Sequence, residues 1–172
     1  MKQTALVTGS NRGIGLELCR QLKQNGFQVI ATCRQRSNAL STLGVEIIED
    51  VEVSEQKSLL KLTNTLSGHP IDWLINNAGI ADGIAMDNLD EHSIASCKRM
   101  FEVNSLGPLL TTQALLNNMS KGSKVGIITS RMGSMADNDS GGSYGYRMSK
   151  AAVNAAGKSL AIDLKPQGIA VA

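Results

Sequence analysis

The stretch VTGSNRGIG, Val7 to Gly15, decides the fold, because it joins a short apolar run to the start of a helical pattern. The run that leads into its glycines, Thr4 to Thr8, predicts a buried strand. Residues 14–25 carry apolar side chains at helical spacing, and Gly26 stands where a helix commonly ends. The stretch therefore predicts a strand, a tight turn and a helix in direct succession.

The same alternation of short apolar runs and longer amphipathic segments continues along the chain. Further strands are predicted at 28–32, 45–48, 72–76 and 124–130, with helices at about 55–66, 90–103, 106–119 and 144–164. The final segment, GIAVA, predicts the start of a sixth strand. Strands separated by helices are typical of βαβ units. We therefore predict a single α/β domain, residues 1–172, with a doubly wound parallel sheet (Rossmann) of five strands plus the start of a sixth and helices on both faces.

The glycines of the opening stretch lie at the turn between strand and helix. Glycine permits a tight turn and close backbone approach, and the N–H groups and positive dipole end of a helix N-terminus bind a pyrophosphate. The alternative is a glycine-rich turn without a ligand; a Walker-type loop is excluded because no Gly-Lys-Ser/Thr follows. We expect a dinucleotide to bind at Gly9, Asn11, Arg12, Gly13, Ile14 and Gly15.

Two arginines indicate which dinucleotide this is. Arg12 stands at the start of the helix, where the helix dipole disfavours a cation, so its position suggests an anionic partner. Cys33 occupies the place after the second strand where an NAD-binding domain usually has an acidic residue, and Arg34 follows it. Each arginine could also be a solvated surface charge. Two arginines and no carboxylate favour a 2′-phosphate, hence NADP (NADPH) rather than NAD.

The segment SYGYRMSK, Ser143 to Lys150, holds both tyrosines of the chain. In a helix, residues four apart share a face, so Tyr146 and Lys150 are neighbours and Tyr144 points elsewhere. A free tyrosine titrates at a pKa of about 10, and a nearby ammonium favours the phenolate. Tyr146 is therefore a candidate general acid, although a Tyr and a Lys at this spacing also occur together by accident.

Together these motifs resemble the classical short-chain dehydrogenases/reductases, particularly the carbonyl-reductase-like and C-factor-like members. TGSNRGIG resembles the cofactor motif of that family, NNAG (Asn76 to Gly79) its fourth-strand motif, and YRMSK its catalytic Tyr-x-x-x-Lys. The resemblance implies an NADPH-dependent oxidoreductase that reduces a small aldehyde or ketone by hydride transfer, with a tyrosine as proton donor.

The resemblance also implies roles for single residues. Tyr146 would protonate the carbonyl oxygen, and Lys150 would assist it and hold the nicotinamide ribose. Ser130 resembles the serine that hydrogen-bonds the substrate oxygen, with Ser134 as its rival because the spacing to Tyr146 is longer than usual. Asn104 resembles the asparagine that positions a water in a proton relay. The plainer alternatives are a strand cap for Ser130 and a helix kink or cap for Asn104.

The remaining cofactor contacts implied by the resemblance come from two segments. Asp50 with Val51 matches the pair that contacts the adenine, although it could simply be an acidic turn. Asn77, Ala78 and Gly79 would form the floor beneath the cofactor, and we expect Asn77 to matter more for structure than for chemistry.

The sequence departs from the family at its end. The family continues past GIAVA into a loop over the nicotinamide, a substrate-binding helix and a seventh strand. We expect residues 1–172 to be the cofactor half of a longer protein, without the usual C-terminal substrate-binding segment. The chief rival is a catalytically silent NADP-binding regulatory or signalling protein. The resemblance also implies a homodimer or homotetramer, formed through the helices that begin near Leu106 and Tyr146.

Composition excludes other classes of function. The net charge is +2, and no basic stripe or alternation of aromatic and basic residues predicts nucleic-acid binding. No apolar run is long enough to cross a membrane, and we expect no signal peptide because the first residues lack its length and cleavage pattern. Three scattered cysteines suit a reducing cytoplasm, and two histidines give a metal site little support.

Overall fold

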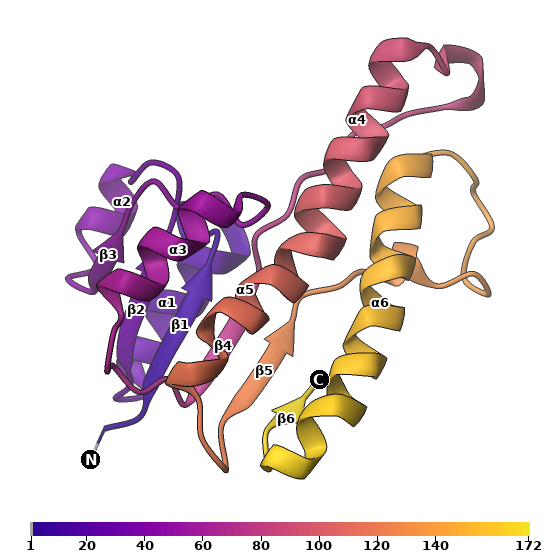
Figure 1. Ribbon diagram of the computed structural model, residues 1–172. Helices are drawn as coiled ribbons and strands as arrows, with labels where there is room; N and C mark the ends of the chain where they lie inside the picture. The colour runs from indigo at the N-terminus through magenta and orange to yellow at the C-terminus, as the bar shows by residue number, and fades with distance from the viewer. Residues whose placement is uncertain (1) are drawn as a thin grey trace.

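A computed structural model describes residues 2–172 of the protein, which form a six-stranded parallel sheet (Figure 1). The strands are β1 (Thr4–Thr8), β2 (Gln28–Thr32), β3 (Glu46–Ile48), β4 (Trp73–Asn76), β5 (Lys124–Ile127) and β6 (Ala170–Val171). Their order across the sheet is β3-β2-β1-β4-β5-β6. The chain therefore winds outward from β1 to β3 and then returns to β4 on the other side of β1, as the sequence predicted.

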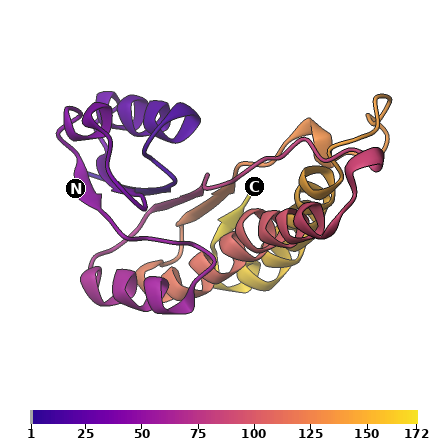
Figure 2. The same cartoon turned by 90° about the horizontal axis from the view of Figure 1, so that it is seen from above.

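Helices cover both faces of the sheet (Figure 2). The helices are α1 (Gly13–Gln24), α2 (Asn38–Ser41), α3 (Gln56–Thr65), α4 (Glu91–Phe101), α5 (Gly107–Leu115) and α6 (Tyr144–Leu164). A π-helical turn, Glu102–Leu106, joins α4 to α5. Helices α1 and α2 pack on one face, and α3, α5 and α6 pack on the other. None of these helices is long and apolar enough to cross a membrane.

The central strand β1 supplies side chains to both layers. All five of its residues are buried. Because successive side chains of a strand point to opposite faces, Leu6 packs with the helices α3, α5 and α6, whereas Val7 packs with α1 and α2. This two-sided burial explains why the first apolar run of the sequence lacks the apolar-polar alternation of a half-exposed strand.

Two local features differ from the sequence prediction. The strand predicted for residues 124–130 ends at Ile127, and Ser130 instead precedes a 3-10 turn, Arg131–Gly133. The hydroxyl oxygen of Ser130 accepts a hydrogen bond from the Met132 N–H at 3.1 Å, which stabilises that turn. Helix α2 was not predicted, because its single turn is too short to show a helical period.

The crossing of α4 and α6 depends on a glycine. A Cβ atom at Gly145 would meet the end of the Met100 side chain and would lie 2.9 Å from the Cys97 Sγ and 3.0 Å from the Cys97 Cα. Because the last of these atoms belongs to the backbone of α4, the two helices would have to move slightly apart. We expect Gly145→Ala to lower the free energy of unfolding by about 1–3 kcal/mol, measured by thermal or urea unfolding.

Gly157 offers a matched control on the same helix. A Cβ atom there would meet the end of the Ile127 side chain at 3.3 Å, and that group can move. Gly157→Ala is expected to leave stability unchanged or to raise it by up to about 1 kcal/mol, since alanine favours a helix interior. Equal destabilisation by both variants would contradict a close helix crossing at Gly145.

Candidate active site and dinucleotide cleft

A cleft of about 550 Å³ opens at the carboxyl ends of β1, β2, β3 and β4. In doubly wound sheets, ligands bind outside the carboxyl ends of the strands, where the strand order reverses. The cleft is lined by Gly9, Asn11, Arg12, Gly13, Ile14, Cys33, Arg34, Gln35, Val51, Glu52, Val53, Asn77, Ala78, Gly79, Ile80, Arg99 and Val103. The predicted cofactor residues at the glycine loop, apart from Gly15, and those after β4 thus line one depression. Gly15 does not line it: a Cβ atom there would lie 2.5 Å from the Asn77 side-chain nitrogen, so this glycine serves the packing of the loop.

The glycine loop is held against the end of β4 at a separation that side chains would prevent. Gly9 has a φ of +66°, and a Cβ atom on it would lie 2.7 Å from the Ala78 Cα. The Asn77 side-chain amide donates hydrogen bonds to the carbonyl oxygens of Thr8 at 2.9 Å and Gly9 at 3.2 Å. Asn77 therefore fixes the loop to the sheet, which is the structural role expected from the sequence.

The start of α1 is shaped to receive an anion. Its N-cap residue, Arg12, makes no side-chain capping bond, and the first turn holds no acidic residue. The Oδ1 atom of Asn11 is buried without a hydrogen-bond partner, and Gly13 has open space where a side chain would stand. Free N–H groups and the positive end of a helix favour a phosphate. The residues present therefore fit the pyrophosphate of a dinucleotide.

The residues after β2 and β3 form the other end of the cleft. Cys33, Arg34 and Val51 line it. Arg34 and Val51 are the residues predicted from the sequence to contact the adenosine end. Asp50 does not line the cleft, contrary to the sequence prediction; its side chain is exposed, and its backbone takes a left-handed conformation with a φ of +59°. Arg12 is exposed and forms no ion pair with residues 2–172.

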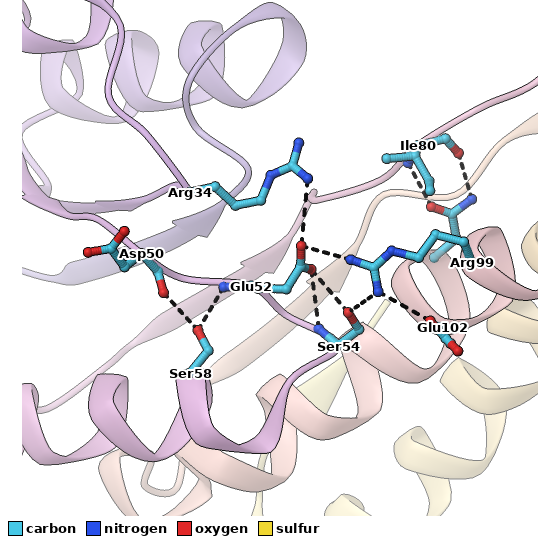
Figure 3. Close-up of polar contacts among 9 residues, drawn as sticks. Arg34, Asp50, Glu52, Ser54, Ser58, Ile80, Arg99 and Glu102 are labelled. Atoms are coloured by element: carbon cyan, nitrogen blue, oxygen red, sulfur yellow. Dashed lines mark hydrogen bonds and ion pairs between the residues drawn. The ribbon is translucent and has the colours of Figure 1, made fainter. Parts of the chain in front are cut away.

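Glu52 is a carboxylate in this part of the cleft that the sequence analysis missed. Its Oε2 atom lies 2.9 Å from a nitrogen of Arg99 on α4 and 3.6 Å from a nitrogen of Arg34 (Figure 3). In the sequence, a carboxylate is expected only at the end of the second strand, whereas Glu52 lies in the loop after β3. Neither Glu52 nor Arg99 belongs to a recognisable motif, so the sequence offered no signal for the pair.

Tyr146 and Lys150 lie together on α6, one helical turn apart. The Lys150 Nζ atom is 5.8 Å from the centre of the Tyr146 ring. Lys150 is only 4% exposed and donates one hydrogen bond, to the Ile128 carbonyl oxygen at 2.8 Å. Burial lowers the pKa of the Lys150 ammonium below its usual value. The predicted pair is thus present, with the lysine fixed from the end of β5.

Asn104 lies in the π-helical turn between α4 and α5, and its side chain is buried. Its Oδ1 atom accepts a hydrogen bond from the Ile80 N–H at 2.8 Å, and its Nδ2 group donates to the Ile80 carbonyl at 2.8 Å and to the Ser149 hydroxyl at 2.9 Å. Asn104 therefore joins three segments: the loop after β4, the π turn and α6. A π turn within a helix often marks a functional site.

Gly79 connects this group to the cleft. It lines the cleft, and a Cβ atom on it would lie 3.2 Å from the Asn104 Oδ1 and 3.8 Å from the Lys150 Nζ. Neither Asn104 nor Lys150 lines the cleft itself, and Gly79 is a residue of its lining that lies close to both polar atoms. Gly79 therefore links the lysine and the asparagine to the edge of the cleft.

Ser130 and Ser134 stand at the two ends of the same 3-10 turn. This turn packs against α6, because a Cβ atom on Gly133 would lie 2.8 Å from the Lys150 carbonyl carbon. The Ser130 oxygen accepts a bond from the Met132 N–H, and the Ser134 oxygen accepts one from the Asp137 N–H at 3.3 Å. Each hydroxyl hydrogen remains available to another acceptor. Within residues 2–172 no cluster of His, Cys, Asp or Glu side chains could hold a metal ion.

The short-chain dehydrogenase family model matches residues 3–172. The chain is 39% identical over 170 residues to 1-hydroxy-2-glutathionyl-2-methyl-3-butene dehydrogenase of Rhodococcus sp. (strain AD45), covering 98% of this chain and 74% of that protein. It is 47% identical over 109 residues to C-signal of Myxococcus xanthus, covering 62% of this chain and 63% of that protein.

A solved structure shows the same fold. The NADPH-bound carbonyl reductase from chicken fatty liver superposes with a TM-score of 0.86 at 29% identity, over 98% of this chain and 76% of that chain. The resemblance to carbonyl-reductase-like and C-factor-like proteins, drawn from three motifs, is confirmed by these matches. The chain belongs to the short-chain dehydrogenase/reductase family of oxidoreductases.

Proposed function

We propose that residues 1–172 form the cofactor-binding and catalytic part of an NADPH-dependent reductase of small aldehydes or ketones. The observation that carries this proposal is the position of Lys150 and Asn104 beside Gly79, at the edge of the dinucleotide cleft, with Tyr146 next to Lys150. In this proposal, a proton donor and a buried cation would lie near one end of a dinucleotide bound along the cleft.

The cofactor would be held by the groups described above. The N-terminus of α1 and the Asn11 side chain would bind the pyrophosphate, and Val51 and Val53 would pack against the adenine. Arg12 and Arg34 would bind the 2′-phosphate of NADP, which favours NADPH over NADH. The NADPH-bound carbonyl reductase of the same fold supports this choice. When bound, the reduced nicotinamide supplies the hydride.

The side chains of this chain would handle the proton and the substrate oxygen. Tyr146 would donate a proton to the carbonyl oxygen as negative charge develops there. Lys150 uses one N–H on the Ile128 carbonyl and has two more, which would hold the nicotinamide ribose and stabilise the deprotonated tyrosine. The Asn104 amide holds the Ile80 carbonyl and the Ser149 hydroxyl in place by hydrogen bonds. A water bound beside Asn104 would pass a proton between Lys150 and solvent.

We also propose that the protein works in the cytoplasm as a homodimer or homotetramer. Phe101, at the end of α4, and Leu106, in the π-helical turn that follows it, are 44% and 39% exposed. Large apolar side chains exposed on adjacent turns favour burial against a second copy. Sedimentation or light scattering of the purified chain measures this directly.

The proposed activity is tested by mixing the purified chain with NADPH and a panel of small aldehydes and ketones, and following the loss of NADPH absorbance. Oxidation that requires both the carbonyl compound and the chain supports a reductase. Tight NADPH binding with no turnover of any carbonyl compound, measured also in the direction of alcohol oxidation, contradicts it and favours a silent NADP-binding protein.

Ser130 and Ser134 can be separated by paired variants. We expect Ser130→Ala to lower kcat about 10²- to 10³-fold, because a donor to the developing oxyanion is lost. The kcat of Ser134→Ala is expected to stay within about threefold of wild type. The hydroxyl oxygen of Ser134 accepts a hydrogen bond from the Asp137 N–H, in the segment that follows the 3-10 turn. The reverse order of effects would assign the substrate contact to Ser134.

A further inference from the structure

Glu52 presents a problem for the binding of an anionic cofactor. Its side chain is only 16% exposed, and it lines the same part of the cleft as Arg34. An unpaired carboxylate at this place would repel a phosphate and would compete with it for Arg34. A site that binds a 2′-phosphate therefore needs another group to neutralise Glu52.

The backbone holds Glu52 in this place. Its N–H donates a hydrogen bond to the Ser58 hydroxyl at 2.7 Å, and that hydroxyl donates to the Asp50 carbonyl at 2.9 Å (Figure 3). The Asp50 and Val51 N–H groups donate to the carbonyl oxygens of Arg34 and Cys33, just after β2, at 3.2 and 3.0 Å. Because the loop is fixed at both sides, Glu52 cannot simply turn out of the cleft with its backbone.

Glu52 has two cationic neighbours, and the structure distinguishes them clearly. The Arg99 nitrogen lies 2.9 Å from the carboxylate, a normal charge-assisted hydrogen bond, whereas the Arg34 nitrogen lies 3.6 Å away. Arg99 is 39% exposed and Arg34 is 71% exposed. The strong partner of Glu52 is therefore Arg99, and Arg34 is only loosely attached.

Other contacts of Arg99 keep it on Glu52. Its second terminal nitrogen donates to the Ser54 hydroxyl at 2.8 Å and pairs with Glu102 at 3.2 Å. The Ser54 hydroxyl in turn donates to the Glu52 Oε1 at 3.1 Å. Both oxygens of the Glu52 carboxylate thus receive hydrogen bonds without the help of Arg34.

We propose that Arg99 is a positioning residue of the 2′-phosphate subsite: by holding the Glu52 carboxylate across the cleft, it leaves Arg34 free to bind the phosphate. The inference rests on the proposed preference for NADPH. A residue of α4, which lies outside the glycine loop and the strand ends, would then affect the preference for NADPH over NADH.

Two variants test this: Arg99→Met alone, and Arg99→Met combined with Glu52→Gln. Their dissociation constants for NADPH and NADH are measured by fluorescence titration. Arg99→Met is expected to weaken NADPH binding about fivefold, the effect of one uncompensated, partly exposed charge. The binding of NADH, which has no 2′-phosphate, should weaken by less than about twofold. Glu52→Gln with Arg99→Met is expected to restore NADPH affinity to that of wild type or better, because the competing charge is gone.

Arg20→Met is the matched control, since Arg20 pairs with Glu17 on α1 outside the cleft. It should leave both constants unchanged, and thermal unfolding of each variant shows whether the fold persists. Direct binding of the phosphate by Arg99 would make the loss persist in the double variant, which overturns the inference. An unchanged NADPH constant in Arg99→Met overturns it as well. A wild-type chain that binds NADH as tightly as NADPH contradicts the proposed function itself.

Discussion

Replacing Tyr146 by phenylalanine is expected to lower turnover about 10²- to 10⁴-fold and to leave the dissociation constant of NADPH within about twofold of wild type. The variant removes one oxygen atom and keeps the ring that lies beside the Lys150 Nζ atom. Tyr146 is partly exposed and α6 is long, so the change should not disturb the fold. Steady-state rates with a carbonyl substrate and a cofactor titration measure the two effects separately.

Tyr144 provides the control for this prediction. It begins α6, two residues before Tyr146, and faces away from Lys150 by helical geometry. Tyr144→Phe should keep the rate within about threefold of wild type. A Tyr146→Phe variant that retained the wild-type rate would show that another group donates the proton, and the proposed mechanism would be wrong.

Replacing Lys150 by methionine is expected to weaken NADPH binding at least about tenfold and to reduce turnover as strongly as the tyrosine variant. Two N–H groups that would bind the ribose are lost, together with the charge beside Tyr146. Methionine fills a similar volume, so the packing around this buried position should survive. Lys158→Met, at an exposed position of the same helix, should change neither quantity.

The same variant gives a signature in the pH dependence of stability. Burial lowers the pKa of Lys150 in the folded protein, so the folded state binds fewer protons than the unfolded state between the lowered value and about 10.4. The contribution of Lys150 to the free energy of unfolding should therefore rise with pH through this alkaline range. Urea unfolding at several pH values should show this rise in wild type and a flatter profile in Lys150→Met; identical profiles would contradict a lowered pKa.

The sheet and the Tyr146–Lys150 pair could be predicted because both depend on local pattern. Buried apolar runs marked the strands, and helical spacing alone placed Lys150 on the same face as Tyr146. The glycine loop was equally clear from its spacing, and the structure shows the close approach of one of its glycines, Gly9, to Ala78. The predicted order of strands and helices was confirmed by the sheet and its two helical layers.

The rest depends on contacts between segments that are distant in sequence. The residues next to Lys150 in the sequence give no sign that its ammonium donates a hydrogen bond to the Ile128 carbonyl. Likewise, the residues next to Asn104 give no sign that its amide forms hydrogen bonds with the backbone of Ile80. The Glu52–Arg99 pair joins the loop after β3 to α4, and neither residue has a motif around it. Such pairs follow from the way the helices cross the sheet, which a single sequence does not specify residue by residue.

We propose that this chain binds NADPH in the cleft lined by Gly79, close to Lys150 and Tyr146. An equilibrium fluorescence titration of residues 1–172 with NADPH and, separately, with NADH tests it most directly. We expect a dissociation constant for NADPH at least about tenfold below that for NADH, the equivalent of roughly 1.4 kcal/mol from the contacts of Arg12 and Arg34 with the 2′-phosphate. Equal or tighter binding of NADH, or no binding of either dinucleotide, would contradict it.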